Sequence, residues 1–196
     1  MLAPGDTKIS LTQTMNIFFL DILLPLCALY HGNKHVVKMP LEAVQLLYTA
    51  KWMLEPAGTW QASAPWNKAQ TSRGYKKTHH NHPLAVWVRE SLANYLYCAD
   101  YALALCAEYT KRFKNKTLHV EQHARWLREN PPANLPDLGP SPVPLCVGDE
   151  ITIREADFAV VVQRYRQYYR DTKRQIAKYP YSQAPAWMDN PVSLEA

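Results

Sequence analysis

The pattern of hydrophobic and polar positions along this chain predicts helices throughout and no strand-rich region. An apolar segment from Ile17 to Tyr30 comes first and ends in a turn. A second helix is expected from Pro40 to about Leu54, because proline suits the first turn of a helix. On that helix Glu42 lies on a polar strip beside an apolar stripe.

The central helix, predicted from Pro83 to about Phe113, has the clearest periodicity. Its apolar residues fall on one core stripe, made of Leu84, Val88, Leu92, Leu96, Ala99 and Leu103. A second stripe mixes aromatic and polar groups: Trp87, Ser91, Asn94, Cys98, Tyr101, Leu105, Glu108 and Arg112. We expect the first stripe to face the core and parts of the second to face a ligand.

Two further helices are predicted over residues 118–130 and 155–178, and a proline-rich segment over 131–144 cannot form a regular helix or central strand. Residues 55–81 are predicted to form a long basic loop, a feature that is often functional in compact domains. The expected fold is all-α, a single compact helical DNA-acting domain over residues 15–196 with long Pro-rich loops. Residues 1–14 are interpreted as a flexible arm or as the result of a wrongly assigned translation start.

Composition narrows the class of protein. With 196 residues and 47% hydrophobic content, the chain can bury one sizeable core, and its net charge of +5 favours an anionic partner. The four cysteines form no CxxC pair, which fits a reducing cytoplasm, that of the host cell if the protein is viral. The longest apolar run, residues 17–29, is shorter than the roughly 20 residues that span a bilayer, so no membrane partner is expected.

Basic and aromatic residues alternate in the last predicted helix, and this combination suits nucleic acid, since cations bind phosphate and flat rings stack on bases. The residues in this pattern are Arg164, Tyr165, Arg166, Tyr168, Tyr169 and Arg170, and all but Tyr168 are assigned as DNA contacts. The alternative is a solvated face whose tyrosines reach out from the core. Lys111 and Arg112 either extend this DNA surface or complement the C-terminus of the central helix.

Histidines cluster at residues 79–82, and His119 and His123 stand one helical turn apart. Neither group has the spacing of a known metal motif, so no metal or other cofactor is expected. His82 directly precedes Pro83 and is interpreted as a helix-starting residue.

The segment from Asn33 to Glu42, NKHVVKMPLE, carries the main candidate site. A carboxylate beside Lys34, His35 and Lys38 could transfer protons on a phosphate-bearing substrate. The alternative role of Glu42 is a favourable interaction with the helix dipole, which contributes about 0.3–1 kcal/mol.

With its lead-in from Met15, this segment resembles the N-terminal region of phage pyrimidine-dimer DNA glycosylases of the endonuclease V type. The spacing of Asn33, His35 and Glu42 matches an acidic or amide residue, a histidine and the catalytic glutamate of that family. Weaker likenesses are EYTKRF at residues 108–113 and YRQYYR at residues 165–170. The loops at 55–81 and 131–154 would be insertions, and Leu41 stands where the family tends to have a phosphate-binding arginine.

The resemblance implies an all-helical, monomeric enzyme that acts on double-stranded DNA, cleaves the N-glycosidic bond of a damaged pyrimidine and nicks abasic sites. In that family the N-terminal α-amine attacks the sugar and the glutamate transfers protons. An α-amine with a pKa near 8 is roughly 10% neutral at pH 7, which makes it a far better nucleophile than an ordinary lysine. Here the amine would come from Met15 or Asn16 if translation starts at Met15, or else from Lys34 or Lys38.

On this hypothesis Glu42 is the acid or base, with His35 and Lys38 beside it. Arg89 and Asn94 join the basic residues named above as DNA contacts, and the base pocket is assigned to His82, Trp87 and Ser91. Two alternatives stay open: a nucleic-acid-binding phage protein without catalysis, and a pyrimidine-modifying or metal-dependent nucleic-acid enzyme.

Overall fold

A computed structural model describes residues 16–148 and 153–189, and the regular structure in this part of the chain is helical apart from one short strand pair, which confirms the all-α prediction. The helices are α1 (Leu24–Tyr30), α2 (Asn33–Leu54), α3 (Pro83–Val88), α4 (Leu92–Arg112), α5 (Val120–Glu129), α6 (Phe158–Lys173) and the short 3-10 helix η1 (Ala186–Met188). The strands β1 (Val143–Pro144) and β2 (Arg154–Glu155) form one antiparallel pair. Residues 1–14, assigned to an arm or a wrong start, lie outside the described residues.

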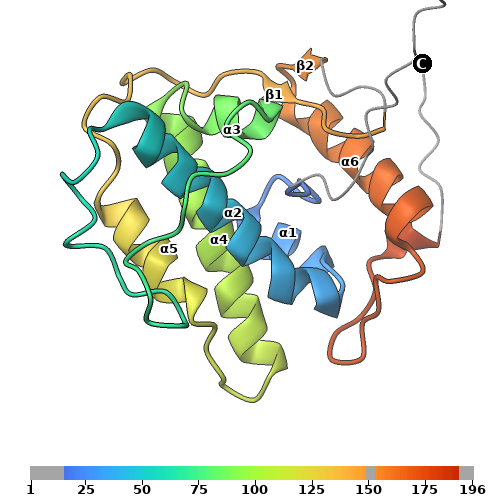
Figure 1. Ribbon diagram of the computed structural model, residues 1–196. Helices are drawn as coiled ribbons and strands as arrows, with labels where there is room; N and C mark the ends of the chain where they lie inside the picture. Colours follow the sequence, from blue (N-terminus) through green and yellow to red (C-terminus); the bar gives the residue numbers. More distant parts are fainter. Residues whose placement is uncertain (1–15, 149–152, 190–196) are drawn as a thin grey trace, which may run out of the picture.

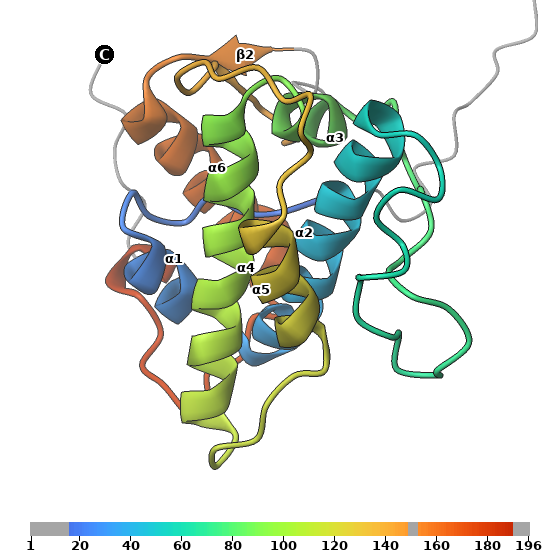
Figure 2. The same cartoon turned by 90° about the vertical axis from the view of Figure 1, so that its left-hand side faces the viewer.

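Helices α2 and α4 form the central pair of the fold (Figure 1). Helix α5 packs against both, and α1 packs against α4. Helix α6 lies on the opposite side from α5, and the loop between α2 and α3 projects from the C-terminal end of α2 (Figure 2). No helix in the described ranges has the length and apolar character needed to cross a bilayer.

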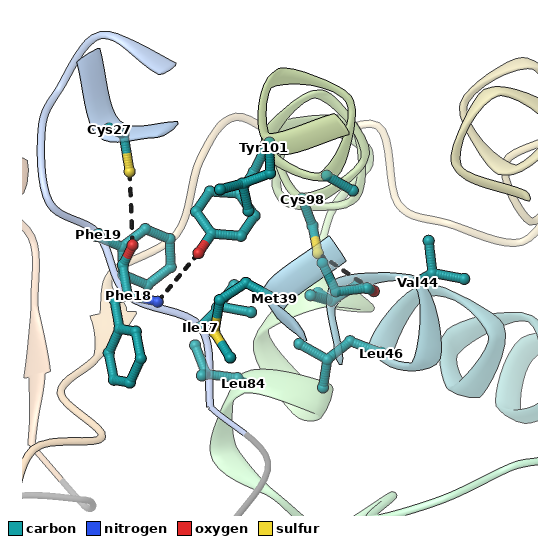
Figure 3. Packing of buried hydrophobic residues seen from close by; sticks show 14 of the residues in the cluster. Ile17, Phe18, Phe19, Cys27, Met39, Val44, Leu46, Leu84, Cys98 and Tyr101 are labelled. Atoms are coloured by element: carbon teal, nitrogen blue, oxygen red, sulfur yellow. Dashed lines mark hydrogen bonds between the residues drawn. The ribbon is translucent and has the colours of Figure 1, made fainter. Parts of the chain in front are cut away.

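Residues 16–20 form an extended segment at the centre of the core, so the predicted apolar segment from Ile17 to Tyr30 is helical only in its second half, α1. Side chains satisfy its backbone: the N–H of Phe18 donates to the Tyr101 hydroxyl at 3.2 Å, and that of Leu20 donates to Sγ of Cys27 at 3.3 Å. Figure 3 shows Phe18 and its neighbours between α1 and α4. Buried backbone groups need partners, and here tertiary contacts supply them in place of a helix.

Helix α2 begins at Asn33, so the prediction that Pro40 starts it is wrong. The first N–H groups find partners outside the helix: Asn33 donates to the Lys178 carbonyl at 2.8 Å, and Gly32 donates to the Tyr169 hydroxyl at 2.9 Å. These contacts fix the start two turns earlier than the proline signal. Glu42 consequently lies in the third turn, where the helix-dipole interaction, confined to the first turn, does not explain it.

The predicted central helix is two helices, because residues 89–91 interrupt it between α3 and α4. Ser91 caps α4 by accepting the N–H of Asn94 at 3.1 Å, and the N–H of Leu92 donates to the Pro136 carbonyl at 2.9 Å. A serine N-cap favours a new helix start over continuation. Three other predictions are confirmed: Pro83 lies in the first turn of α3, α5 falls within residues 118–130, and a final helix is present. The final helix, α6, is shorter than predicted and spans residues 158–173.

The second, mixed stripe of the central helix is buried, whereas Leu92, Leu96 and Leu103 of the expected core stripe are only half-buried. The reason lies in the irregular segments around α4, whose backbone groups need hydrogen-bond partners. Asn94 donates to the Trp87 carbonyl at 2.8 Å and to Oγ of Ser141 at 2.7 Å. Buried polar side chains of this kind hold the structure together and are paired within it.

Candidate functional site

A pocket of about 220 Å³ opens between α2, α6 and the extended N-terminal segment. It contains all five residues assigned from the sequence to the catalytic group: Asn16, Lys34, His35, Lys38 and Glu42. The remaining lining residues are Phe18, Met39, Tyr168, Lys173 and Ile176. Helical spacing explains part of this convergence, since residues 34, 35, 38 and 42 follow one face of α2.

The Glu42 carboxylate is buried and held from two sides. Its Oε2 accepts the backbone N–H of Asn16 at 2.9 Å, a contact between residues 26 positions apart. Its Oε1 pairs with Nζ of Lys38 at 2.8 Å, one helical turn away, and the Lys38 side chain is 61% exposed. One oxygen of this carboxylate contacts a backbone nitrogen and the other contacts a solvent-exposed ammonium. A carboxylate oriented in this way is well placed for proton transfer.

Asn16 is anchored so that its backbone nitrogen stays beside Glu42. Its Nδ2 donates to the Cys146 carbonyl at 2.8 Å, which ties the segment to the chain just after β1. Its Oδ1 is buried and has no hydrogen-bond partner among the described residues. An unpaired buried acceptor costs about 1–3 kcal/mol, so this oxygen offsets part of the stability that the Nδ2 contact contributes.

His35 is held neutral. Its Nδ1 lies 2.5 Å from the Tyr169 hydroxyl, which also accepts the N–H of Gly32 at 2.9 Å. Burial, followed by the charges of Lys173, Lys38 and Lys34, lowers the pKa of His35 to about 4. At neutral pH the imidazole is therefore a hydrogen-bond donor or acceptor and carries no charge.

The pocket is electropositive. Its lining contains three lysines, Lys34, Lys38 and Lys173, and one carboxylate, Glu42, a formal balance of +2. Lys173, in the last turn of α6, was missed as a site residue from the sequence, whereas Tyr168 was among the aromatic residues considered for nucleic acid. Nζ of Lys173 lies 5.2 Å from the centre of the Tyr168 ring. The basic, aromatic character of α6 pointed to this helix, but only packing shows which of its side chains reach the pocket. A concave site with this charge attracts anions such as phosphate.

The tyrosines predicted to stack on bases do not face solvent. Tyr165 and Tyr169 are fully buried. The Tyr165 hydroxyl accepts the N–H of Cys146 at 3.2 Å, and the Tyr169 hydroxyl serves Gly32 and His35 as described above. Their prediction as DNA-stacking residues is corrected: they fix the core and orient the histidine.

Several cations predicted to contact DNA are engaged inside the fold. Arg112 is buried against Glu108 and the end of α1, and Arg166 pairs with Asp21 at 2.5 Å and with the Leu20 carbonyl at 2.7 Å. Arg89 donates to the carbonyls of His80 and Ala85.

Three predicted cations remain nearer the surface. Lys111 is 74% exposed, 3.9 Å from Glu108. Arg164 and Arg170 are half-buried on α6, with Arg170 3.3 Å from Asp171. The predicted DNA surface is therefore much reduced.

The residues predicted to form the base pocket lie inside the fold and away from the pocket at Glu42. Trp87, Ser91 and Asn94 are buried, and none of them lines the pocket at Glu42. His82 caps α3 by accepting the N–H of Leu84 at 3.2 Å, as its position before a proline indicated. These residues keep α3 and α4 in place, and a base would have to enter beside Phe18 and Tyr168 instead.

Comparison with protein-family models, curated proteins and solved structures finds no match for this chain. The site therefore has to be interpreted from its own geometry.

The histidine clusters were the basis of the metal alternative. Within residues 16–148 and 153–189, no group of three or more His, Cys, Asp or Glu side chains is placed to hold a metal ion. Both ring nitrogens of His123 are hydrogen-bonded within the fold: Nδ1 lies 2.8 Å from the Tyr48 hydroxyl and Nε2 lies 3.1 Å from the Trp66 carbonyl. His123 therefore has a structural role.

Proposed function

We propose that this protein cleaves the N-glycosidic bond of a damaged or modified pyrimidine in DNA, through an amine nucleophile assisted by Glu42. The observation that carries the proposal is the 2.9 Å contact between the backbone nitrogen of Asn16 and the Glu42 carboxylate, at an electropositive pocket. In a form of the chain that begins at Asn16, this nitrogen is a primary α-amine. It then lies where the resemblance to the endonuclease V type of glycosylase requires the nucleophile.

In this reaction the Glu42 carboxylate acts first as a base and then as an acid. The neutral amine forms a bond to the sugar C1′ while the bond from C1′ to the base breaks, and the electron pair leaves with the base, which takes a proton from water. Glu42 accepts a proton from the attached nitrogen and then delivers it to O4′ as the C1′–O4′ bond opens. The product is a protonated imine between enzyme and sugar, which water can hydrolyse or which can eliminate the 3′ phosphate.

The other pocket residues have binding roles. Lys34 and Lys173 supply positive charge for the phosphates that flank the target nucleotide. Tyr168 and Phe18, whose ring centres are 6.3 Å apart, offer an aromatic wall for the extruded base. The neutral imidazole of His35 provides a hydrogen bond to the base or sugar.

The nucleophile can be tested by borohydride trapping on UV-irradiated duplex DNA, with chains that begin at Met1, at Met15 and at Asn16. Reduction of an imine leaves a covalent protein–DNA adduct. An adduct formed only by the shortest chain identifies the α-amine of Asn16. An adduct formed equally by all three, and lost in Lys34→Ala or Lys38→Ala, identifies a lysine instead.

The role of the carboxylate is tested by Glu42→Gln, which should lower the rate of base release by about 10²- to 10⁴-fold, the usual contribution of general acid–base catalysis. Glu121→Gln is a matched control, because it also removes a carboxylate paired one turn away with a cation, here Arg125. An unchanged rate in Glu42→Gln would refute the assignment. Retained DNA binding with neither adduct nor released base would favour the non-catalytic binding protein.

A further inference from the structure

A second concave site lies at the other end of α2, away from Glu42. It is a groove of about 530 Å³ between the C-terminal turn of α2 and the following loop, with Trp52 and Tyr75 as its aromatic walls and Arg73 and Lys76 as its charged residues. Figure 1 shows this loop, residues 55–82, at the end of α2 remote from α6. The groove plays no part in the chemistry proposed above.

The walls of the groove are held in place by the fold. The indole N–H of Trp52 donates to the Tyr75 carbonyl at 2.9 Å, and its ring packs edge-on against Trp60 with centres 5.0 Å apart. Gly74 has a φ of +66°, and a Cβ there would approach Tyr48 to 2.8 Å, so the chain passes too close for another residue. A site with rigid aromatic walls loses little side-chain entropy when a flat ligand binds.

Apart from Glu55 at its start, which pairs with Lys51 of α2 at 2.7 Å, the charge of this loop has one sign. Residues 56–82 contain four cations, Lys68, Arg73, Lys76 and Lys77, and no Asp or Glu. The guanidinium of Arg73 stacks over the Trp66 ring at 4.7 Å and donates to the Ala64 carbonyl at 2.9 Å, and it makes no other hydrogen bond within the described residues. Aromatic rings with interleaved cations and no competing carboxylates match the needs of a single-stranded nucleic acid.

The loop also leads from the groove back toward Glu42. Trp52 contacts Tyr75, and one turn earlier on α2 Thr49 bonds the N–H and the carbonyl of Thr78. Residues 75–78 thus run antiparallel to α2, and Lys76 and Lys77 are exposed along the way. From Glu42 to Trp52 is ten residues, or about 15 Å along the helix axis.

We propose that the groove binds an unpaired nucleotide of the strand whose target sits at Glu42, with the base against Trp52 and Tyr75 and the phosphates on Arg73 and Lys76. At about 3.4 Å per stacked nucleotide, 15 Å places this base roughly four nucleotides from the target. The protein would then hold a locally opened strand at two points. The proposal rests on the proposed function, because it places the target nucleotide of the same strand at Glu42.

Photocrosslinking tests the placement directly. A single-stranded oligonucleotide carrying an abasic target and one 5-bromodeoxyuridine at each position in turn is irradiated with the full chain, and the modified residue is found by mass spectrometry. We expect the crosslink to Trp52 or Tyr75 to be strongest about four nucleotides from the target. Crosslinks to these residues that are equally strong from every position, or absent from all, would overturn the proposal.

Binding measurements test the energetics. Trp52→Leu should weaken oligonucleotide binding about 5- to 150-fold, the range for losing one base–aromatic stack. The double variant Arg73→Ala/Lys76→Ala should reduce the slope of log K against log salt by about 1.4, since each phosphate contact on a single strand contributes about 0.7.

The variant Lys114→Ala/Lys116→Ala is the matched control, because it removes the same charge from exposed sites at the far end of α4. Its slope should be unchanged. Equal slopes for the two double variants would show that Arg73 and Lys76 contact no phosphate and would overturn the proposal. Displacement of the oligonucleotide by a polyglutamate of equal charge would show that the groove recognises only charge and would overturn base recognition. Loss of borohydride adducts with groove binding intact would instead count against the catalytic proposal alone.

Discussion

Replacing Arg112 with alanine should strongly destabilise the fold. The Arg112 side chain is 1% exposed, and its Nε lies 2.7 Å from Oε1 of Glu108. Its other nitrogens donate to the carbonyls of His31 and Leu29, both at 2.7 Å, and to Oδ1 of Asn33 at 3.0 Å. One guanidinium thus satisfies the last carbonyls of α1 and joins α1, the start of α2 and the end of α4.

The magnitude follows from what the substitution leaves behind. Alanine strands the buried Glu108 carboxylate and exposes two helix-end carbonyls to an empty space. Removing one member of a buried ion pair costs about 3–5 kcal/mol. With a urea m-value of about 2 kcal/mol per M, the unfolding midpoint should fall by about 1.5–2.5 M.

The assay is urea unfolding followed by circular dichroism, with Lys111→Ala as the neighbouring control. Lys111 is 74% exposed and 3.9 Å from the same carboxylate, so its removal should change stability by no more than about 0.5 kcal/mol. If Arg112→Ala is as stable as the control and has lost DNA binding, Arg112 is a phosphate contact and the structural role is refuted.

Two other outcomes follow from the same structure. Burial lowers the pKa of His31 to about 3 and that of His35 to about 4, below the ordinary 6.5. Between pH 6.5 and about 4 these histidines are therefore protonated in the unfolded chain but neutral in the folded protein. Urea unfolding should therefore show a stability that is level above pH 6.5 and falls as the pH drops from about 6.5 to about 4; a flat profile across that window would contradict the neutral, buried imidazoles. Gly32→Ala would place a Cβ 2.6 Å from Cα of Ala177 and should cost about 1–3 kcal/mol, whereas Gly139→Ala, with nothing within 4 Å, should be close to neutral in the same assay. Equal stabilities of the two variants would show that the backbone around Ala177 can shift to make room for the Cβ without loss of stability.

The local signals in the sequence determined the helical class and part of the site. Apolar periodicity fixed α5 and the body of α4, and Pro83 marked the start of α3, because these features depend on neighbours within one or two turns. The spacing of Lys34, Lys38 and Glu42 likewise required only that the segment be helical for these residues to share a face.

Only the tertiary structure decided which polar residues line the pocket and which are buried in the core. Arg112, Asn94 and Tyr169 have the composition of a nucleic-acid surface, yet they are buried, because irregular backbone nearby needed hydrogen-bond partners that no local pattern reveals. The same holds for the contact of Asn16 with Glu42 and for the arrival of Lys173 at their pocket. Such pairings join residues far apart in the chain, and their geometry is set by how the helices pack, a property of the whole fold.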